Sequence, residues 1–288
     1  MSERRIQFEY QAGHVSAICA TMSPERLERY LNAAGGDLEK ALRGYTRNAR
    51  LSEAFYTPLQ GVEIAIRNAF HKQLVKAFGQ FWYDELDKQN ILDPQKDRKT
   101  PGTLLKLREA RQYLQEKGKP ETSSRMAAEL SFGFWVGICA KRYQKDLWNP
   151  FLNNPFKGLS LTRRDVFERL EKIRNLRNRI AHHEPILNRN LPNDYANILE
   201  TIRWICGASA NWIEATSCFR ERWGEPIAPV PFENLTEEAV FNLKTAAELL
   251  NLSPDELARH AVLAVAKDSH AWRSVILPMR DDGKAPKQ

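Results

Sequence analysis

The sequence of 288 residues lacks any long apolar run, and none of its hydrophobic stretches approaches the ~20 residues that a membrane-spanning helix needs. Its first residues, 1–9, also lack the apolar core of a signal peptide. These two absences exclude the usual sequence signatures of membrane proteins and secreted proteins. We therefore expect a cytoplasmic protein without a membrane partner.

Cysteine is scarce as well, with only Cys19, Cys139, Cys206 and Cys218 in the chain. No two of them have the CxxC spacing, and no histidine stands at the spacing typical of a shared zinc site. This pattern argues against a disulfide framework, which small secreted proteins need and cytoplasmic proteins rarely contain. We expect four buried thiols, and we predict no metal and no other cofactor.

The chain also lacks the alternation of apolar and polar residues that is typical of β-strands, so the expected class is all-α. Hydrophobic residues make up 42% of the chain and charged residues 27%, as in soluble globular proteins. Lysine and arginine total 43 against 36 acidic residues, which gives a net charge of +7. A surplus of this size is compatible with nucleic-acid binding but does not by itself indicate it.

Helical periodicity extends over most of the chain up to about residue 222. Ser23 is a typical N-cap followed by proline at the first helical position, and Gly118 is a typical C-cap. Gly133 and Gly137, four residues apart in an apolar stretch, would allow another helix to approach closely. Helices are expected over residues 24–31, 38–45, 52–78, 103–117, 127–143, 161–184 and 195–222.

A proline-rich segment near the end of the chain, residues 224–234, has the composition of a linker. It predicts one large helical domain before it, residues 1–223, and a small helical tail after it, residues 235–288. The tail contains two short helical patterns. We expect it to serve dimerisation or to bind a partner.

The densest group of cations lies near the end of the helix expected over residues 161–184. Arg174, Asn178 and His182 follow one another at four-residue steps and therefore share one face of this helix. Arg177 lies within the apolar face, which predicts that it points toward the interior or into a cleft. Arginine binds phosphate through a planar fork of donors, and histidine transfers protons near neutral pH. Such a combination has the chemistry needed to cut RNA without a metal ion.

The spacing of Arg177 and His182 raises a geometric question, because five residues correspond to about 140° around an ideal helix. The two side chains point the same way only if the helix loosens at its end, which Pro185 favours by disfavouring helical geometry at Glu184. Alternatively, two copies of the chain meet across a two-fold axis and each contributes its arginine and histidine to one cleft. His183 faces elsewhere, and we expect it to cap the helix or to support Glu184.

A second polar row, formed by Glu63, Arg67 and His71 with Asn68 beside it, also follows four-residue steps on one helical face. We favour a structural interpretation, in which Glu63 and Arg67 form an ion pair that orients neighbouring helices. In the functional alternative, Glu63 holds a catalytic arginine or histidine in place.

The segment from Arg177 to Glu184 resembles the arginine–histidine motif of HEPN-domain ribonucleases, and the whole chain is similar to the Abi-like family of bacterial abortive-infection proteins. Three other segments carry this resemblance in the expected order, and the resemblance as a whole covers about residues 20–222. They are Ser23-Pro24-Glu25-Arg26-Leu27-Glu28-Arg29-Tyr30-Leu31, Glu63-Ile64-Ala65-Ile66-Arg67-Asn68 and Leu130-Ser131-Phe132-Gly133-Phe134-Trp135.

The resemblance implies a HEPN-like helical bundle with additional N-terminal helices, and a homodimer that brings two motifs into one cleft. It implies metal-independent RNA cleavage in anti-phage defence or as a toxin, with Arg177 and His182 as catalytic residues and Asn178 orienting one of them. RNA is the expected partner, together with an antitoxin or another regulatory partner. We assign supporting or RNA-binding roles to Arg174, Arg179, His183, Glu63, Arg67, Asn68 and His71.

Two other functions are consistent with the same residues. The protein could be an RNA-binding module that holds a small RNA or a partner protein without cutting RNA, in which case the basic row contacts phosphates. It could also be a structural or regulatory dimer whose tail contacts a partner. The three hypotheses differ in whether RNA is bound and whether it is cut.

Overall fold

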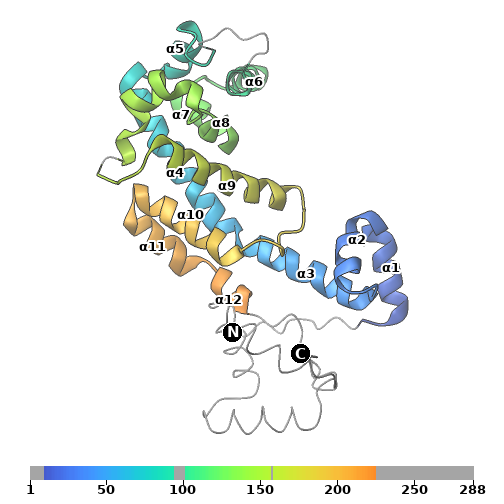
Figure 1. The fold of residues 1–288 in the computed structure, drawn as a ribbon. Coiled ribbons are helices and arrows are strands. Elements are labelled where there is room, and N and C mark those ends of the chain that lie inside the picture. The colour runs from blue at the N-terminus through green and yellow to red at the C-terminus, as the bar shows by residue number, and fades with distance from the viewer. Residues whose placement is uncertain (1–9, 94–100, 157, 225–288) are drawn as a thin grey trace, which may run out of the picture. The chain divides into compact units, whose positions relative to one another are not determined.

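The computed structural model describes residues 10–93, 101–156 and 158–224 (Figure 1). Within these ranges the chain forms helices and turns and no strand, which confirms the expected all-α class. The chain forms two compact units: one comprises Asn48–Phe219, and the other combines Met1–Arg47 with Arg220–Gln288. The expected tail lies outside the described residues, so the domain boundaries inferred from the sequence stay predictions.

In the smaller unit, the described chain begins with α1 (Ala12–Met22) and α2 (Pro24–Ala33) and enters the first turns of α3 (Leu38–Ala54). Ser23 caps α2, because its side-chain oxygen accepts the backbone N–H of Arg26 at 3.4 Å. This is the N-cap that the sequence predicted. α12 (Phe219–Gly224) begins at the last residue of the larger unit.

The larger unit contains the rest of α3 and eight further α-helices, with a π-helix and two 3-10 turns between α8 and α9. The α-helices are α4 (Tyr56–Phe78), α5 (Trp82–Lys88), α6 (Gly102–Glu116), α7 (Ser123–Glu129), α8 (Phe132–Gly137), α9 (Arg163–Ala181), α10 (Leu191–Ile205) and α11 (Gly207–Thr216). The short elements are η1 (Lys141–Tyr143), the π-helix η2 (Gln144–Leu152) and η3 (Asn154–Phe156).

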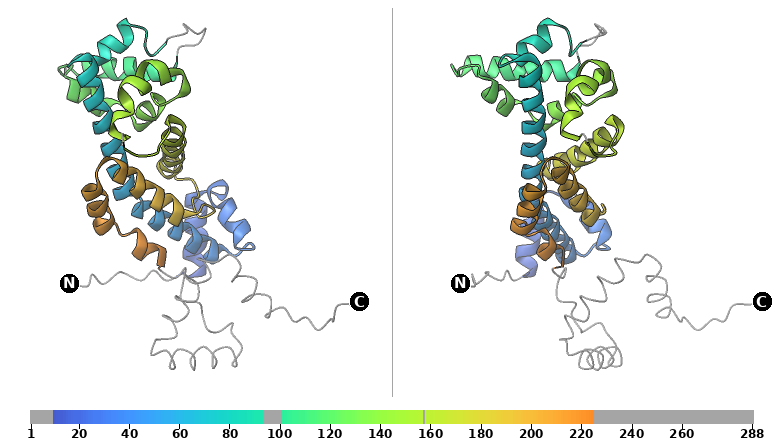
Figure 2. Two further views of the ribbon diagram at one scale, coloured as in Figure 1. Left: turned by 60° about the vertical axis from the view of Figure 1, so that its left-hand side comes forward. Right: turned by 90° about the vertical axis from the view of Figure 1, so that its left-hand side faces the viewer.

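The long helix α4 runs through this unit and contacts most of its other helices (Figures 1 and 2). α10 and α11 pack against it on one side, and α5, α7 and α8 also contact it. Its apolar face is fully buried at the four-residue steps that the sequence predicted, through Val62, Ile66, Phe70 and Leu74. α4 is therefore the central helix of this unit, while α6 and α9 pack on helices that contact it.

The close approach predicted for Gly133 and Gly137 is present, and the helix that approaches is α6. A Cβ atom added to Gly137 would lie 2.5 Å from Cγ2 of Thr103, and one added to Gly133 would lie 2.6 Å from Nζ of Lys106. The hydroxyl group of Thr103 is hydrogen-bonded to Tyr143, which restricts its side chain. Gly137 therefore allows α6 and α8 to pack at short range, whereas the neighbour of Gly133 is the end of a lysine side chain.

Two segments that the sequence predicted as single helices are broken in the structure. Within the buried stretch over residues 127–143, α7 ends at Leu130 (φ −73, ψ 122). α8 then begins after Ser131, which is also extended (φ −64, ψ 158). The segment over residues 195–222 is interrupted at Cys206 (φ −157, ψ 113), which separates α10 from α11, and again at Ser217 (φ −82, ψ 133), before α12. Apolar periodicity did not reveal these breaks because both sides of each break carry buried side chains.

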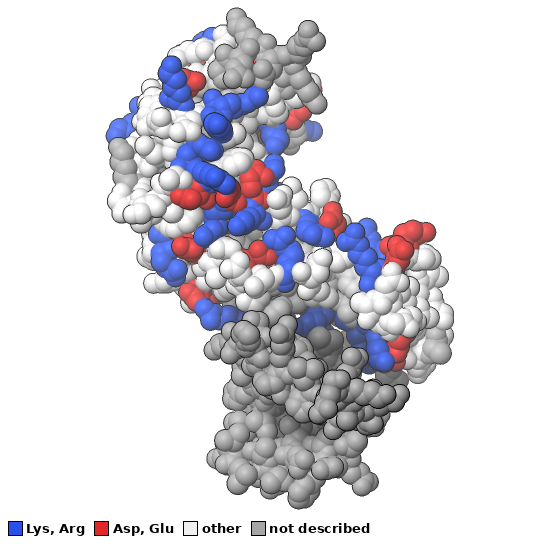
Figure 3. Space-filling model, viewed as in Figure 1, with Lys and Arg blue, Asp and Glu red and all other residues white. Residues whose placement is uncertain are grey.

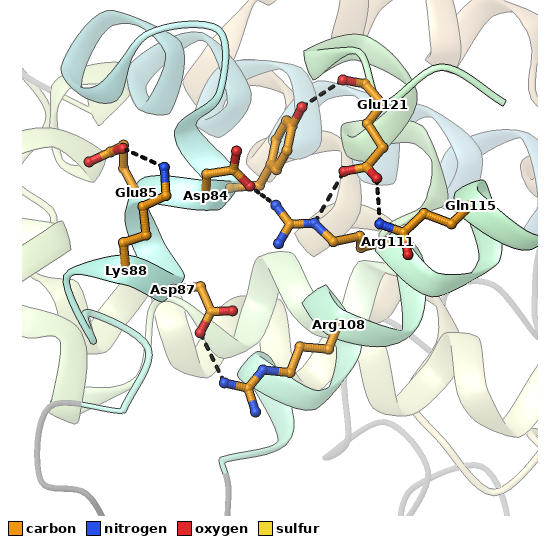
Figure 4. Close-up of polar contacts among 9 residues, drawn as sticks. Asp84, Glu85, Asp87, Lys88, Arg108, Arg111, Gln115 and Glu121 are labelled. Carbon is orange, nitrogen blue, oxygen red and sulfur yellow. Dashed lines mark hydrogen bonds and ion pairs between the residues drawn. The ribbon is translucent and has the colours of Figure 1, made fainter.

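A network of charged side chains joins α5 and α6 to the segment before α7 (Figure 4). Arg111 forms ion pairs with Asp84 and with Glu121, the latter at 3.2 Å between Nε and Oε2. Arg108 binds Asp87 at 3.0 Å, and Gln115 donates to Oε1 of Glu121 at 2.7 Å. These contacts connect α5, α6 and the segment before α7. Because several charges form one network, they contribute to the stability of this end of the unit in addition to its apolar packing.

The burial expected for all four cysteines is confirmed for Cys139 and wrong for the other three, of which Cys19 is half-buried. Cys139 is buried, whereas Cys206 and Cys218 are exposed, because they lie at the junctions between α10, α11 and α12 rather than on an apolar helix face. All four are free thiols. Among the described helices, none combines the length and the apolar character required to span a membrane.

Candidate functional site

Helix α9 carries the central motif and begins with a complete capping box. The side chain of Thr162 accepts the backbone N–H of Asp165, and the Asp165 carboxylate accepts the backbone N–H of Thr162 at 2.8 Å. The buried face of α9 consists of Val166, Leu170, Ile173 and Leu176, while Ile180 near its end is only half-buried. α9 is thus well packed over its first turns and more exposed at its C-terminal end.

The end of α9 is a Schellman motif that places two histidines in solvent. The N–H of His183 donates to the Ile180 carbonyl at 3.0 Å, and the N–H of Glu184 donates to the Arg179 carbonyl at 2.8 Å. His182 is the C-cap residue, and its N–H still donates to the Asn178 carbonyl at 2.9 Å. The helical hydrogen-bond pattern therefore persists to His182, and both histidine side chains are exposed.

His183 occupies the position of this motif that usually holds glycine, because its φ is 56°. A Cβ atom in this left-handed conformation costs roughly 1–2 kcal/mol. We expect the free energy of unfolding of the His183→Gly protein to be about 1 kcal/mol higher than that of the His183→Ala protein. Both variants lose the imidazole, but only the glycine variant also loses the Cβ atom. Urea unfolding of the two variants tests this expectation, and equal midpoints with equal slopes would contradict it.

Arg177 is held by a carboxylate from another helix. Its Nε lies 4.0 Å from Oε2 of Glu63 on α4, and the Arg177 side chain is 42% exposed. At this distance the pair is an ion pair rather than a hydrogen bond. The guanidinium group is thus oriented from α4 while a large part of it remains accessible to a ligand. Arg177 lies at a partly exposed helix–helix boundary and not in the interior.

The neighbouring arginines of α9 are paired with acidic residues of their own. Nη2 of Arg174 donates to Oε2 of Glu171 at 2.7 Å, and Nε of Arg179 lies 3.4 Å from Oε2 of Glu184. The second pair joins two residues of the Schellman motif and so stabilises the turn that carries His182. The structure shows no hydrogen bond from the Asn178 side chain to another described residue, and its orienting role stays a prediction.

The polar row on α4 divides into two parts. Glu63 pairs with Arg177 and not with Arg67, whose Nε donates to Oδ1 of the exposed Asn68 at 3.3 Å. The structural ion pair that we favoured from the sequence is therefore replaced by a contact between α4 and α9. This contact is the one that the functional alternative required of Glu63.

His71 lies farther along α4 and belongs to a different environment. Its Nε2 is 2.8 Å from the hydroxyl group of Ser123, which also accepts the indole N–H of Trp82 at 3.0 Å. Burial, and secondarily the positive charge of Arg67, lower the pKa of His71. Two helical turns, about 12 Å along the axis, separate His71 from Glu63. These contacts indicate a role in joining α4, α5 and α7.

A residue that sequence reasoning missed, Asn48, holds the segment that follows the motif. Asn48 is buried on α3, and its Oδ1 accepts the backbone N–H of the fully buried Ile186 at 2.8 Å. This bond anchors the chain shortly after His182 and His183. Because 138 residues separate its two partners, no local sequence signal could have revealed it.

Arg177 and His182 do not converge within one chain. The helical hydrogen bond at His182 excludes the loosened helix end that would have turned the two side chains together. They therefore diverge by about 140° around the axis and are separated by about 7.5 Å along it. Both side chains are present on one helix, but one copy does not direct them toward the same point.

Lysine and arginine side chains alternate with acidic side chains over the face that includes α9 (Figure 3). Across residues 10–93, 101–156 and 158–224, no group of three or more histidine, cysteine or acidic side chains has the arrangement of a metal site. The exposed His182 imidazole makes no hydrogen bond or ion pair with another described residue. It is thus available to a ligand.

The comparisons with known proteins concern the part of the chain that contains both α4 and α9. A family model described as Abi-like protein matches residues 10–188, which include Glu63, Arg177 and His182. A search of curated proteins found no match, and neither did a search of solved structures. The family match confirms the similarity that the ordered sequence segments indicated. Since it covers more than half of the sequence, the chain belongs to the family of Abi-like proteins.

Proposed function

We propose that this protein is an endoribonuclease of the HEPN type that acts in abortive infection, with Arg177 and His182 as its catalytic residues. Membership in the Abi-like family supports the role in abortive infection. The nuclease activity is supported by the end of α9, where an exposed histidine follows a partly exposed arginine that Glu63 orients. An antitoxin or another regulatory partner restrains the activity in the cell.

In this mechanism the RNA supplies its own nucleophile, the 2′-hydroxyl group. A bond forms between O2′ and phosphorus while the bond from phosphorus to O5′ breaks, so the 2′-hydroxyl loses a proton and O5′ gains one. His182 takes or donates one of these protons, and Arg177 stabilises the negative charge that develops on the phosphoryl oxygens. The products are a 2′,3′-cyclic phosphate and a 5′-hydroxyl, and none of these steps requires a metal ion.

A homodimer completes the site in this proposal. Because Arg177 and His182 diverge on one helix, a two-fold axis beside the end of α9 is the arrangement that sets the arginine of one copy beside the histidine of the other. The exposure of His182, and its lack of a bonded partner among the described residues, are consistent with a side chain that acts across such an interface. Two symmetry-related pairs result, each with the Arg177 of one copy and the His182 of the other.

Incubation of the purified wild-type protein with end-labelled single-stranded RNA, in EDTA, tests the activity. We expect cleaved RNA with 2′,3′-cyclic phosphate and 5′-hydroxyl ends, and intact DNA of the same sequence, because DNA lacks the 2′-hydroxyl group. Equal cleavage of DNA would overturn the mechanism. RNA that is bound but not cut would favour the RNA-binding module, and no RNA binding would favour the structural or regulatory dimer.

A further inference from the structure

Lys106 on α6 is a cation that the proposed mechanism does not use. Its ammonium group lies over Gly133 of α8, within 2.6 Å of the point that a Cβ atom would occupy. Gly133 belongs to the segment 130–135, one of those through which the sequence resembles the Abi-like family. Its missing side chain leaves the space in which the lysine amine rests.

The charge of Lys106 is only partly compensated. Neither a hydrogen bond nor an ion pair within 4.0 Å connects its ammonium group to another described residue. Burial, and next the charge of Arg174, lower the pKa of Lys106, and the carboxylates of Glu109 and Glu171 oppose this change without cancelling it. A half-buried lysine whose positive charge is only partly balanced by nearby carboxylates is stabilised when an additional anion binds.

Arg174 provides a second group of donors on α9, which packs on α8 as α6 does, and its charge acts on Lys106. Its Nη2 binds Glu171, and it makes no other hydrogen bond or ion pair with a described residue, so part of its planar fork of donors remains uncommitted. Arg174 precedes Arg177 by three residues, which makes the two arginines neighbours on the surface of α9. Lys106, Arg174 and Arg177 are therefore considered together as one group of cations on α6 and α9.

We infer that Lys106 and Arg174 form a phosphate subsite that binds the RNA backbone beside the phosphate held by Arg177. An arginine fork together with a lysine point charge is a common combination for binding phosphate. RNA is the ligand with the required chemistry, because any strand that places one phosphate at Arg177 carries further phosphates next to it. This inference rests on the proposed function for its ligand, and it assigns to Lys106 and Arg174 the positioning of the substrate.

Salt-dependent binding of RNA tests the subsite independently of cleavage. The full-length His182→Ala protein serves as the inactive background, and its affinity for a fluorescein-labelled single-stranded RNA is measured by polarisation at several salt concentrations. Addition of Lys106→Gln is expected to weaken binding about fivefold to tenfold. It should also reduce the slope of log K against log salt by about 0.7, the value for one phosphate contact on a single strand.

Lys172→Gln is the matched control, because it removes the same charge from an exposed position of α9. We expect it to leave the slope unchanged, and Lys106→Arg to retain the wild-type slope because it keeps the charge. Gly133→Ala places a methyl group where the amine now rests, and should weaken binding in the same direction as Lys106→Gln. Circular dichroism of each variant verifies that the helices are retained.

Equal slopes for Lys106→Gln and Lys172→Gln would overturn the subsite, as would an absence of RNA binding by the background protein. The nuclease is judged separately, from cleavage by the wild-type protein. If the wild-type protein cleaves RNA but Lys106→Gln and Lys172→Gln have equal slopes, the nuclease is supported and the subsite is not. A reduced slope for Lys106→Gln without wild-type cleavage would leave a phosphate subsite on an RNA-binding protein.

Discussion

Replacement of His182 by alanine is expected to lower the rate of RNA cleavage by about 10²–10⁴-fold, the usual contribution of a general acid or base. The affinity for RNA should change little, because in the proposed mechanism His182 acts in proton transfer, whereas Arg177 contacts the phosphate. The fold should also persist, since the imidazole is exposed and makes no bond with another described residue. Single-turnover cleavage and polarisation measurements separate the two effects.

His14→Ala is a suitable control for this experiment, because it removes an exposed histidine from α1 in the other unit. It should cleave RNA at the wild-type rate. Arg177→Ala should lose activity as His182→Ala does, because it removes the group that stabilises the phosphoryl charge. Retention of wild-type activity by His182→Ala would contradict the assignment of this residue to proton transfer.

A dimer that contains one Arg177→Ala chain and one His182→Ala chain is expected to cleave RNA at about half the wild-type rate. Each chain alone is inactive, but the mixed dimer contains one cleft with an intact arginine from one copy and an intact histidine from the other. Two affinity tags on co-expressed chains allow this species to be purified. Its activity is then compared with that of the two parent variants.

The reciprocal dimer distinguishes a shared cleft from two independent sites. It pairs a wild-type chain with a chain that carries both Arg177→Ala and His182→Ala, so every shared cleft lacks one of its two groups. We expect it to be inactive. If each chain instead carried its own complete site, this dimer would show half of the wild-type activity and the first mixed dimer would show none. A monomer in light scattering would contradict the shared cleft directly.

Several local features of the structure follow from the sequence by itself. The apolar face of α4 and the cap at Ser23 were both predicted correctly. The all-α class follows in the same way from the absence of strand patterns. These features depend on residues only a few positions apart, and such neighbours are fixed in space once a helix forms.

The breaks within the expected helices and the partner of Glu63 were decided by the tertiary structure. Helical spacing favoured Arg67, four residues away, but the packing of α9 on α8 and α10, both of which contact α4, brings Arg177 to Glu63 instead. In the same way, His71 binds Ser123 on α7 rather than joining the cations of α9. An ion pair between helices depends on which faces meet, and that information is distributed over the whole apolar core.

The sequence determined which chemical groups the end of α9 offers, and the tertiary structure decided how they are directed. The order of Arg177, Asn178 and His182 is a property of the chain and was readable without coordinates. That the helix persists to His182, and that Asn48 secures Ile186 beyond it, results from hydrogen bonds made in the folded molecule. Because a regular helix fixes the angle between its side chains, this persistence separates the two catalytic candidates within one copy.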